Sequence, residues 1–202
     1  MQANTTPLVI SFFTVDTPYQ EEVKRLIDSC RRFNIDHYVE GIKSQGSWLR
    51  NVAKKPEFIA EKLLQFKRPL FWVDADGAFK NKPQFEQFKA FDIAVREVEA
   101  YKDDPWMKLH AGSIFLNYNP KMVRFVEEWV QLCNDKIKDD VVNLFFLDQT
   151  SLLQMIGQFQ GLKVGKLPIG YCKVFDAPAE QIDPSTVVIE QYQASRRLKD
   201  LI

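Results

Sequence analysis

The first third of the chain alternates between two hydrophobic periods, and this constrains the fold more than any other feature. Short runs rich in β-branched and aromatic residues predict buried strands at 7–15, 36–42 and 69–75. Between them, apolar residues at helical spacing, each run opened by a proline, predict helices at 18–33 and 56–66. This alternation favours right-handed crossovers, so we expect an α/β fold with a mostly parallel central sheet flanked by helices.

Further strands and helices follow, and no internal repeat, low-complexity segment or linker separates them. We therefore expect a single domain over residues 1–202, a length that can bury a sizeable core. The predicted later strands lie within 91–95, 113–118, 163–175 and 185–193, and the predicted later helices cover 120–135 and 139–159.

Composition excludes several classes of protein. With 46% apolar and 27% charged residues, the chain has the composition of a soluble globular domain. Its formal net charge of zero argues against nucleic acid as the main partner. No apolar run is long enough for a transmembrane segment, and no basic region precedes the first apolar run, so no signal peptide is expected. Three widely spaced cysteines suit reduced thiols and a cytoplasmic location.

Asp74 and Asp76 follow an apolar run in the stretch RPLFWVDADGAF. In an extended chain residues i and i+2 point the same way, so the two carboxylates can converge. They also stand just beyond the carboxyl end of a predicted strand, where open α/β sheets bind ligands. Paired carboxylates suit Mg²⁺ or Mn²⁺, but Asp and Gly are also common in polar turns. Both interpretations stay open at this point.

Two other motifs with paired acids fit less well. An EF-hand loop needs oxygen ligands at alternate positions and Glu at the twelfth, where this chain has Ala78, Lys80 and Phe85. A haloacid-dehalogenase-type phosphatase also carries D-x-D-G after an apolar strand, with its first Asp, here Asp74, as the phosphorylated nucleophile. That family usually has Thr where this chain has Ala78. We keep the phosphatase as an alternative function.

Four segments in a fixed order resemble a known family. They are residues 46–79 with the D-x-D motif, 91–97 with Asp-Ile-Ala, 109–130 with a glycine-containing strand, and 147–154 with Asp-Gln. Together they resemble a small GT-A fold glycosyltransferase of the nucleotide-diphospho-sugar transferase family, over nearly the whole chain. The resemblance implies a metal-dependent enzyme that moves a hexosyl or related group from a UDP- or GDP-sugar to a glycan, lipid or protein acceptor.

The resemblance also implies roles for individual residues. Asp74 would lie near the ribose and the metal, and Asp76 would bind Mn²⁺ or Mg²⁺, which stabilises charge on the leaving diphosphate. Asp148 and Gln149 would be catalytic, beside the reacting sugar. Because a charge inside an apolar helix is costly unless it is paired or faces a pocket, helix–helix pairing is the alternative for Asp148. The residues expected to bind the nucleotide sugar are Phe13, Thr14, Val15, Trp48, Asn51, Lys55, Asp74, Ala75, Gly112 and Arg196.

The end of the chain departs from the family pattern. Many GT-A enzymes place a metal-binding His on a late strand, where this chain offers Gln191 and Gln193. One of these two amides would be the third ligand, or the diphosphate would hold the metal more than the protein does. The missing His also supports a second alternative, a catalytically inactive domain that binds nucleotide sugars. His110 is expected to be a partly buried structural histidine.

Overall fold

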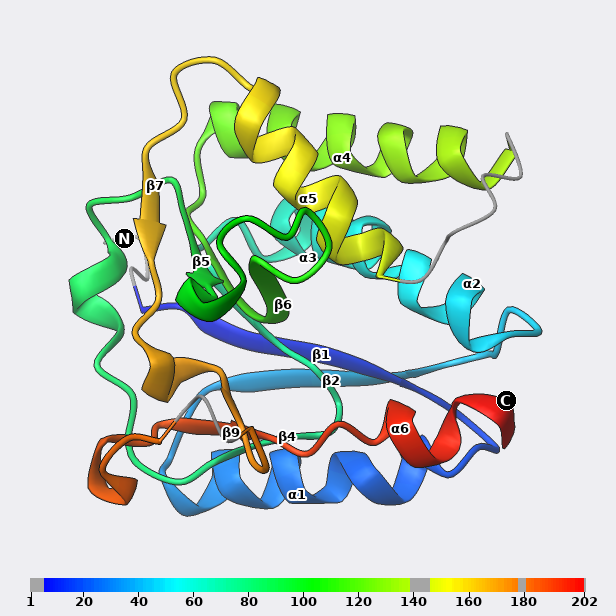
Figure 1. Ribbon diagram of the computed structural model, residues 1–202, viewed down its shortest axis with the longest axis vertical. Helices are drawn as coiled ribbons and strands as arrows, with labels where there is room; N and C mark the ends of the chain where they lie inside the picture. The colour runs from blue at the N-terminus through cyan, green and yellow to red at the C-terminus, as the bar shows by residue number, and fades with distance from the viewer. Residues whose placement is uncertain (1–5, 139–145, 178–180, 202) are drawn as a thin grey trace.

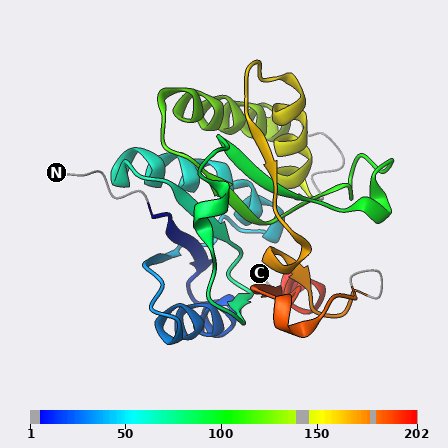
Figure 2. The same ribbon diagram turned by 90° about the vertical axis from the view of Figure 1, so that its left-hand side faces the viewer.

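The apolar runs form a mixed six-stranded sheet that lies between two layers (Figures 1 and 2). A computed structural model describes residues 6–138, 146–177 and 181–201. Successive side chains of a strand face opposite sides, so Ile10 and Trp72 enter one core and Val9 and Phe71 enter the other. The strands stand in the order β2 (His37–Ile42), β1 (Leu8–Thr14), β3 (Leu70–Val73), β6 (Leu109–Leu116), β5 (Ile93–Glu97) and β7 (Val164–Lys166).

The prediction of a mostly parallel sheet is corrected by β6. β1 pairs in parallel with β2 and β3, and β5 pairs in parallel with β7, as the helical connections require. β6 instead runs antiparallel to both β3 and β5. Only a loop and a short 3-10 turn connect β5 to β6, and a parallel neighbour needs a longer crossover, usually a helix.

Helices cover one face of the sheet. These are α2 (Trp48–Ala53), α3 (Lys55–Phe66), α4 (Pro120–Lys138) and α5 (Leu147–Gln158). α4 lies against α3 and α5 above the sheet in Figure 1, and its Phe125 and Trp129 are fully buried in the same core as Ile59 of α3. The helix predicted at 139–159 is confirmed from Leu147 onward, and its first part falls outside the described residues.

The opposite face carries α1 (Tyr19–Arg32), α6 (Ser195–Leu198) and a small second sheet. In that sheet β9 (Ile189–Gln191) lies between β4 (Gly77–Phe79) and β8 (Lys173–Val174). The pairing of Gly77 with Gln191 brings the end of the chain beside the D-x-D motif. Short 3-10 turns complete the described elements at Phe85–Phe88, Glu99–Tyr101, Ile169–Tyr171, Pro184–Thr186 and Lys199–Leu201.

Two further observations concern the predictions from composition. Among the described residues, no helix combines the length and the apolar character that crossing a membrane would require. Cys30, Cys133 and Cys172 are all buried free thiols, so the predicted absence of a disulfide framework is confirmed.

Candidate functional site

A pocket of about 420 Å³ opens at the edge where β1 and β3 end. Because these strands are parallel, Thr14 and Asp74 lie at the same edge of the sheet. β6 runs the opposite way, so it begins where β3 ends, and the amide of Asp74 donates to the carbonyl of Gly112 at 2.9 Å. The antiparallel orientation of β6 therefore brings its amino end into the pocket.

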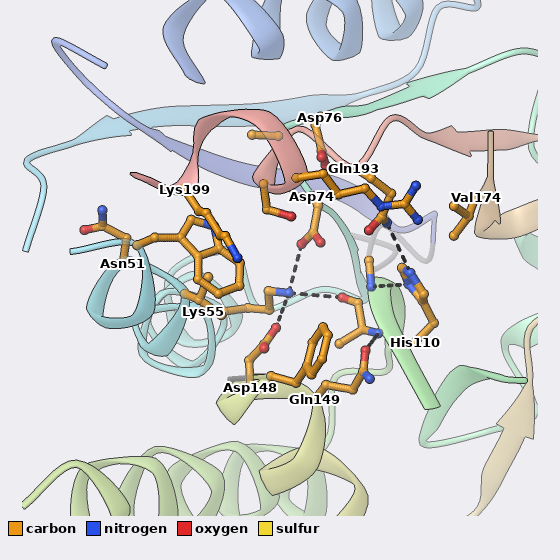
Figure 3. A pocket seen from close by; sticks show the side chains of 18 of the residues that line it. Asn51, Lys55, Asp74, Asp76, His110, Asp148, Gln149, Val174, Gln193 and Lys199 are labelled. Atoms are coloured by element: carbon orange, nitrogen blue, oxygen red, sulfur yellow. Dashed lines mark hydrogen bonds and ion pairs between the residues drawn. The ribbon is translucent and has the colours of Figure 1, made fainter. Parts of the chain in front are cut away.

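Lys55 lies at the centre of the pocket between two carboxylates (Figure 3). Its Nζ is 2.9 Å from Asp74 Oδ1, forms an ion pair with Asp148 Oδ2, and donates to the carbonyl of Ala111 at 3.2 Å. The Trp72 ring lies beneath it, with the centroid 5.3 Å from Nζ, and the Trp72 indole N–H donates to Asp74 Oδ1 at 2.7 Å. One buried cation thus joins residues from α3, β3, α5 and β6.

Electrostatics favour the charged form of Lys55. Burial by itself would lower the pKa of Lys55, but the carboxylates of Asp148 and Asp74 outweigh burial and raise that pKa above its ordinary value. Asp148 is buried within α5, where a charge without a partner would be costly. Lys55 supplies that partner to Asp148, which lines the pocket.

Asp76 lies deeper than Asp74 and accepts a hydrogen bond from the amide of Ala194 at 2.6 Å. Burial and the nearby negative charge of Asp74 both raise the pKa of Asp76 above its ordinary value. Two carboxylates that repel each other in a pocket fit a divalent cation, which would remove the repulsion. In the described part of the chain, no group of three or more His, Cys, Asp or Glu residues is placed to hold a metal. The protein thus offers a pair of carboxylates, a set typical of Mg²⁺ sites completed by phosphates and water.

The two late glutamines occupy different environments. Gln191 is buried behind the pocket, where its Nε2 donates to Gly112 O at 2.9 Å and Ser113 Oγ at 3.1 Å, and its Oε1 meets no hydrogen-bond partner among the described residues. Gln193 lines the pocket itself, with its amide 3.4 Å from His110 Nε2. Of the two amides, Gln193 is the one that faces the same cavity as Asp74 and Asp76.

Gln149 is bonded to backbone at both ends of its amide. Its Nε2 donates to the carbonyl of Trp106 at 2.6 Å, and its Oε1 accepts from the amide of Ala111 at 3.3 Å. These bonds connect α5 to β6 and to the loop that precedes it. The geometry makes Gln149 a positioning residue for that loop.

Most of the residues predicted to bind the nucleotide sugar line this pocket. Val15 does not, and instead packs against β2, where a Cβ placed on Gly41 would lie 2.7 Å from Val15 Cγ1. Asn51 lines the pocket but also holds the loop before α2, since its Oδ1 accepts from the amide of Gln45 at 2.6 Å. The predicted residues that line the pocket are Phe13, Thr14, Trp48, Asn51, Lys55, Asp74, Ala75, Asp76, Gly112, Asp148, Gln149 and Arg196.

Comparison with known proteins connects this architecture to solved structures. No protein-family model matches the chain, and neither does any curated protein. Among solved structures, a glycosyltransferase involved in the glycosylation of the major capsid of PBCV-1 matches with a TM-score of 0.68 and 14% identity over 93% of both chains. The glycosyltransferase GlyE of Streptococcus pneumoniae TIGR4 matches with a TM-score of 0.57 and 14% identity, over 93% of this chain and 55% of that one.

The chain has a glycosyltransferase fold. Within this fold the Asp-Ile-Ala segment is structural. Asp92 accepts hydrogen bonds from Asn119 Nδ2, Lys121 Nζ and the amide of Lys163, all at 2.9 Å, and so joins the starts of β5, α4 and β7. It does not line the pocket.

Several pocket residues of this glycosyltransferase fold were not predicted from the sequence. Trp72 had a usable signal, because it precedes Asp74 by two residues in a strand and so points to the same side. Tyr19, Met107 and Phe146 had none, since they lie outside the predicted strands and reach the pocket through the tertiary fold. Lys199, near the end of the described chain, lines the pocket together with Arg196.

Proposed function

We propose that this chain is a glycosyltransferase that moves a sugar from a nucleoside-diphosphate sugar, with UDP or GDP as the nucleotide, to an acceptor hydroxyl. In this reaction the bond between the sugar C1 and the diphosphate oxygen breaks, and the nucleoside diphosphate leaves with its electron pair. A bond from C1 to the acceptor oxygen forms, and the proton of the acceptor hydroxyl passes to the released diphosphate or to water. The observation that carries the proposal is the convergence of Asp74, Asp76, Lys55 and Asp148 in one pocket of a glycosyltransferase fold.

The acidic pair is the proposed cation site. Asp74 and Asp76 would hold Mn²⁺ or Mg²⁺, with Gln193 as the amide that faces the same cavity. A bound divalent cation would offset the negative charge that develops on the leaving diphosphate. Arg196, which also pairs with Asp176, and Lys199 line the same pocket and would bind the phosphates.

Lys55 and Asp148 act together in the proposal. Asp148 lies at the pocket wall as a buried carboxylate, suited to orienting a sugar hydroxyl or stabilising positive charge at C1. Lys55 fixes the position of that carboxylate, because it pairs with Asp148 and Asp74 at once. Its own role is therefore to position the two acids, rather than to bind phosphate as a free cation.

Isothermal titration calorimetry tests the donor and the cation together. UDP and GDP are titrated into the protein with Mn²⁺, with Mg²⁺ and with EDTA. We expect one nucleotide to bind, and to bind at least tenfold more tightly with the cation than with EDTA. Asp76→Asn should keep weak nucleotide binding and lose the gain from the cation. Failure of wild type to bind either nucleotide under any condition would overturn the proposal.

The chemistry of Asp74 distinguishes the phosphatase alternative from the proposed glycosyltransferase. A nucleophilic Asp74 needs a carboxylate oxygen open to phosphorus, and because Asp74 Oδ1 accepts from Trp72 and is paired with Lys55, the attacking oxygen would have to be Oδ2. We expect no beryllofluoride adduct on Asp74, which ¹⁹F NMR would detect.

The inactive-domain alternative predicts tight nucleotide binding with neither donor hydrolysis nor transfer. A donor-hydrolysis assay on the same samples distinguishes this alternative from an active enzyme.

A further inference from the structure

The loop between β5 and β6, residues 98–108, exposes large apolar side chains at the edge of the pocket. Tyr101 is 45% exposed, Trp106 43% and Met107 36%. Figure 2 shows this loop in green, extending outward from the body of the molecule. Exposed apolar groups gathered beside a pocket are typical of a ligand-binding surface.

Tyr101 and Trp106 border a second hollow, shallow and widely open to solvent, that adjoins the first. Its lining comes from the loop and includes Tyr101, Trp106, Asp103 and Asp104. Tyr101 lines both hollows, while Met107 and Val98 line the first. A molecule seated on the loop would therefore lie next to a molecule in the main pocket.

Hydrogen bonds hold the loop in this shape. Asp104 Oδ1 accepts from the amides of Trp106 at 2.7 Å and Met107 at 3.1 Å, and the amide of Val98 donates to the carbonyl of Lys108 at 2.8 Å. Gln149 of α5 then binds the carbonyl of Trp106. Within the described part of the chain the hydrogen bonds at Trp106 use its backbone, and its side chain is left exposed on a loop that these bonds hold.

The chemistry of this hollow selects among acceptors. Aromatic faces offer an apolar surface to the C–H face of a sugar ring, and carboxylates accept hydrogen bonds from its hydroxyls. Asp103 and Asp104 disfavour a phosphorylated or otherwise anionic acceptor by like-charge repulsion. A purely apolar chain would leave these two carboxylates without hydroxyl partners.

We propose that the hollow formed by Tyr101, Asp103, Asp104 and Trp106 is an acceptor subsite for a neutral sugar ring. The inference rests on the proposed function, because it takes the main pocket as the donor site. It names the acceptor class as a neutral glycan or glycoside. Gln149 supports the subsite by fixing the loop, and Tyr101 joins it to the donor pocket.

The test measures glycoside binding with saturation-transfer NMR and titration. The probes are the methyl glycopyranosides of glucose, galactose and mannose, with 1-octanol as the apolar probe and glucose 6-phosphate as the anionic probe. We expect wild type to bind at least one methyl glycoside and Trp106→Ala to weaken it about tenfold. Trp106→Phe should recover most of the loss. Tyr118→Ala is the matched control, because Tyr118 is an exposed aromatic residue, at 36% against 43% for Trp106, but follows the opposite end of β6.

Each outcome decides the inference. Absence of glycoside binding, equal binding by Trp106→Ala, or stronger binding of 1-octanol or glucose 6-phosphate than of every methyl glycoside would overturn it. Titration of UDP and GDP on the same samples separates it from the proposed function. Normal nucleotide binding, with no glycoside binding that depends on Trp106, would overturn only the proposed subsite. Glycoside binding that depends on Trp106, in a protein that does not bind nucleotide, would support a sugar site and overturn the proposed glycosyltransferase function.

Discussion

Two lysines on α3 are buried to nearly the same degree but differ in their partners and in their relation to the pocket. Lys55 and Lys62 stand seven residues apart, two turns along the helix, and are 5% and 3% exposed. Each lies over aromatic rings, Lys55 above Trp72 and Lys62 above Phe58 and Tyr38. By helical position and burial the two lysines are equivalent, although the family resemblance singled out only Lys55.

They differ in what neutralises their charge. Lys55 pairs with Asp148, whose side chain is 8% exposed, and with Asp74, both at the pocket. Lys62 pairs with Glu40 and Glu61, whose side chains are 37% and 65% exposed, outside the pocket. The comparison teaches that a buried cation is not itself a sign of function. What distinguishes Lys55 is that one of its partners, Asp148, is buried and would be left as a buried charge without it, whereas Asp74, at 34%, is nearly as exposed as Glu40.

Replacement of Lys55 is expected to have the largest effect, and it tests whether the two lysines really differ. Lys55→Met keeps the length of the side chain but leaves Asp74 and Asp148 without their shared cation. Loss of one partner of a buried pair costs about 3–5 kcal/mol, so we expect the free energy of unfolding in urea to fall by that amount. Nucleotide affinity with Mn²⁺ should fall at least tenfold, because the pocket gains net negative charge.

Lys62→Met is the matched control for this change. Its partners are screened by water, and we expect the free energy of unfolding to change by no more than about 1 kcal/mol. Nucleotide affinity should equal that of wild type. If both variants lost stability and affinity equally, the distinction between the two lysines would be wrong.

The second prediction tests whether the two acids paired with Lys55, Asp74 and Asp148, have different roles. Asp148→Asn keeps the volume of the side chain and a hydrogen-bond acceptor for Lys55, while Asp74 still neutralises the lysine. We expect nucleotide affinity to change less than threefold and the rate of sugar transfer or donor hydrolysis to fall about 100-fold or more. The ratio of rate loss to affinity loss, from steady-state kinetics and calorimetry, checks this. A variant with wild-type rate would show that Asp148 serves only to pair Lys55.

A smaller effect is expected from the indole that holds Asp74. Trp72→Phe keeps a ring beneath Lys55 but removes the Nε1 donor to Asp74 Oδ1. We expect nucleotide affinity with Mn²⁺ to fall about three- to tenfold, because a hydrogen bond to a charged group contributes roughly 1–2 kcal/mol. Trp129→Phe is the control, since Trp129 of α4 also donates through its indole, to Ser151 of α5, but is buried in the core away from the pocket. It should lower stability and leave affinity unchanged.

The comparison also shows how far the sequence could be used. Local patterns were enough for β1, α1, β2, α3 and β3, and the D-x-D motif was enough to place Asp74 and Asp76 together at the edge of the sheet, whereas Asp148 came from the family resemblance. Lys55 was predicted to bind the donor and it lines the pocket, but its ion pairs were not predicted, because an ion pair across α3, β3 and α5 depends on tertiary packing. The orientation of β6 and the bonds that Gln149 makes to the β5–β6 loop were not predicted for the same reason, and the catalytic role of Gln149 stays a prediction.

The smallest predicted effect concerns acid stability and the pair Lys62–Glu40. Hydrogen bonding to Lys62 holds the pKa of Glu40 below its ordinary value, although burial alone would raise it. Because the folded carboxylate is the harder one to protonate, this pair stabilises the fold above the ordinary glutamate pKa of about 4.3 and loses that contribution as the pH falls through the lower, folded pKa. Lys62→Met removes the cause of the shift. Urea unfolding at pH 7 and near pH 3.5 should therefore show wild type and Lys62→Met differing less in acid than at neutral pH. A difference that stayed constant or grew in acid would mean that Lys62 stabilises α3 through its contacts with Phe58 and Tyr38 and not through Glu40.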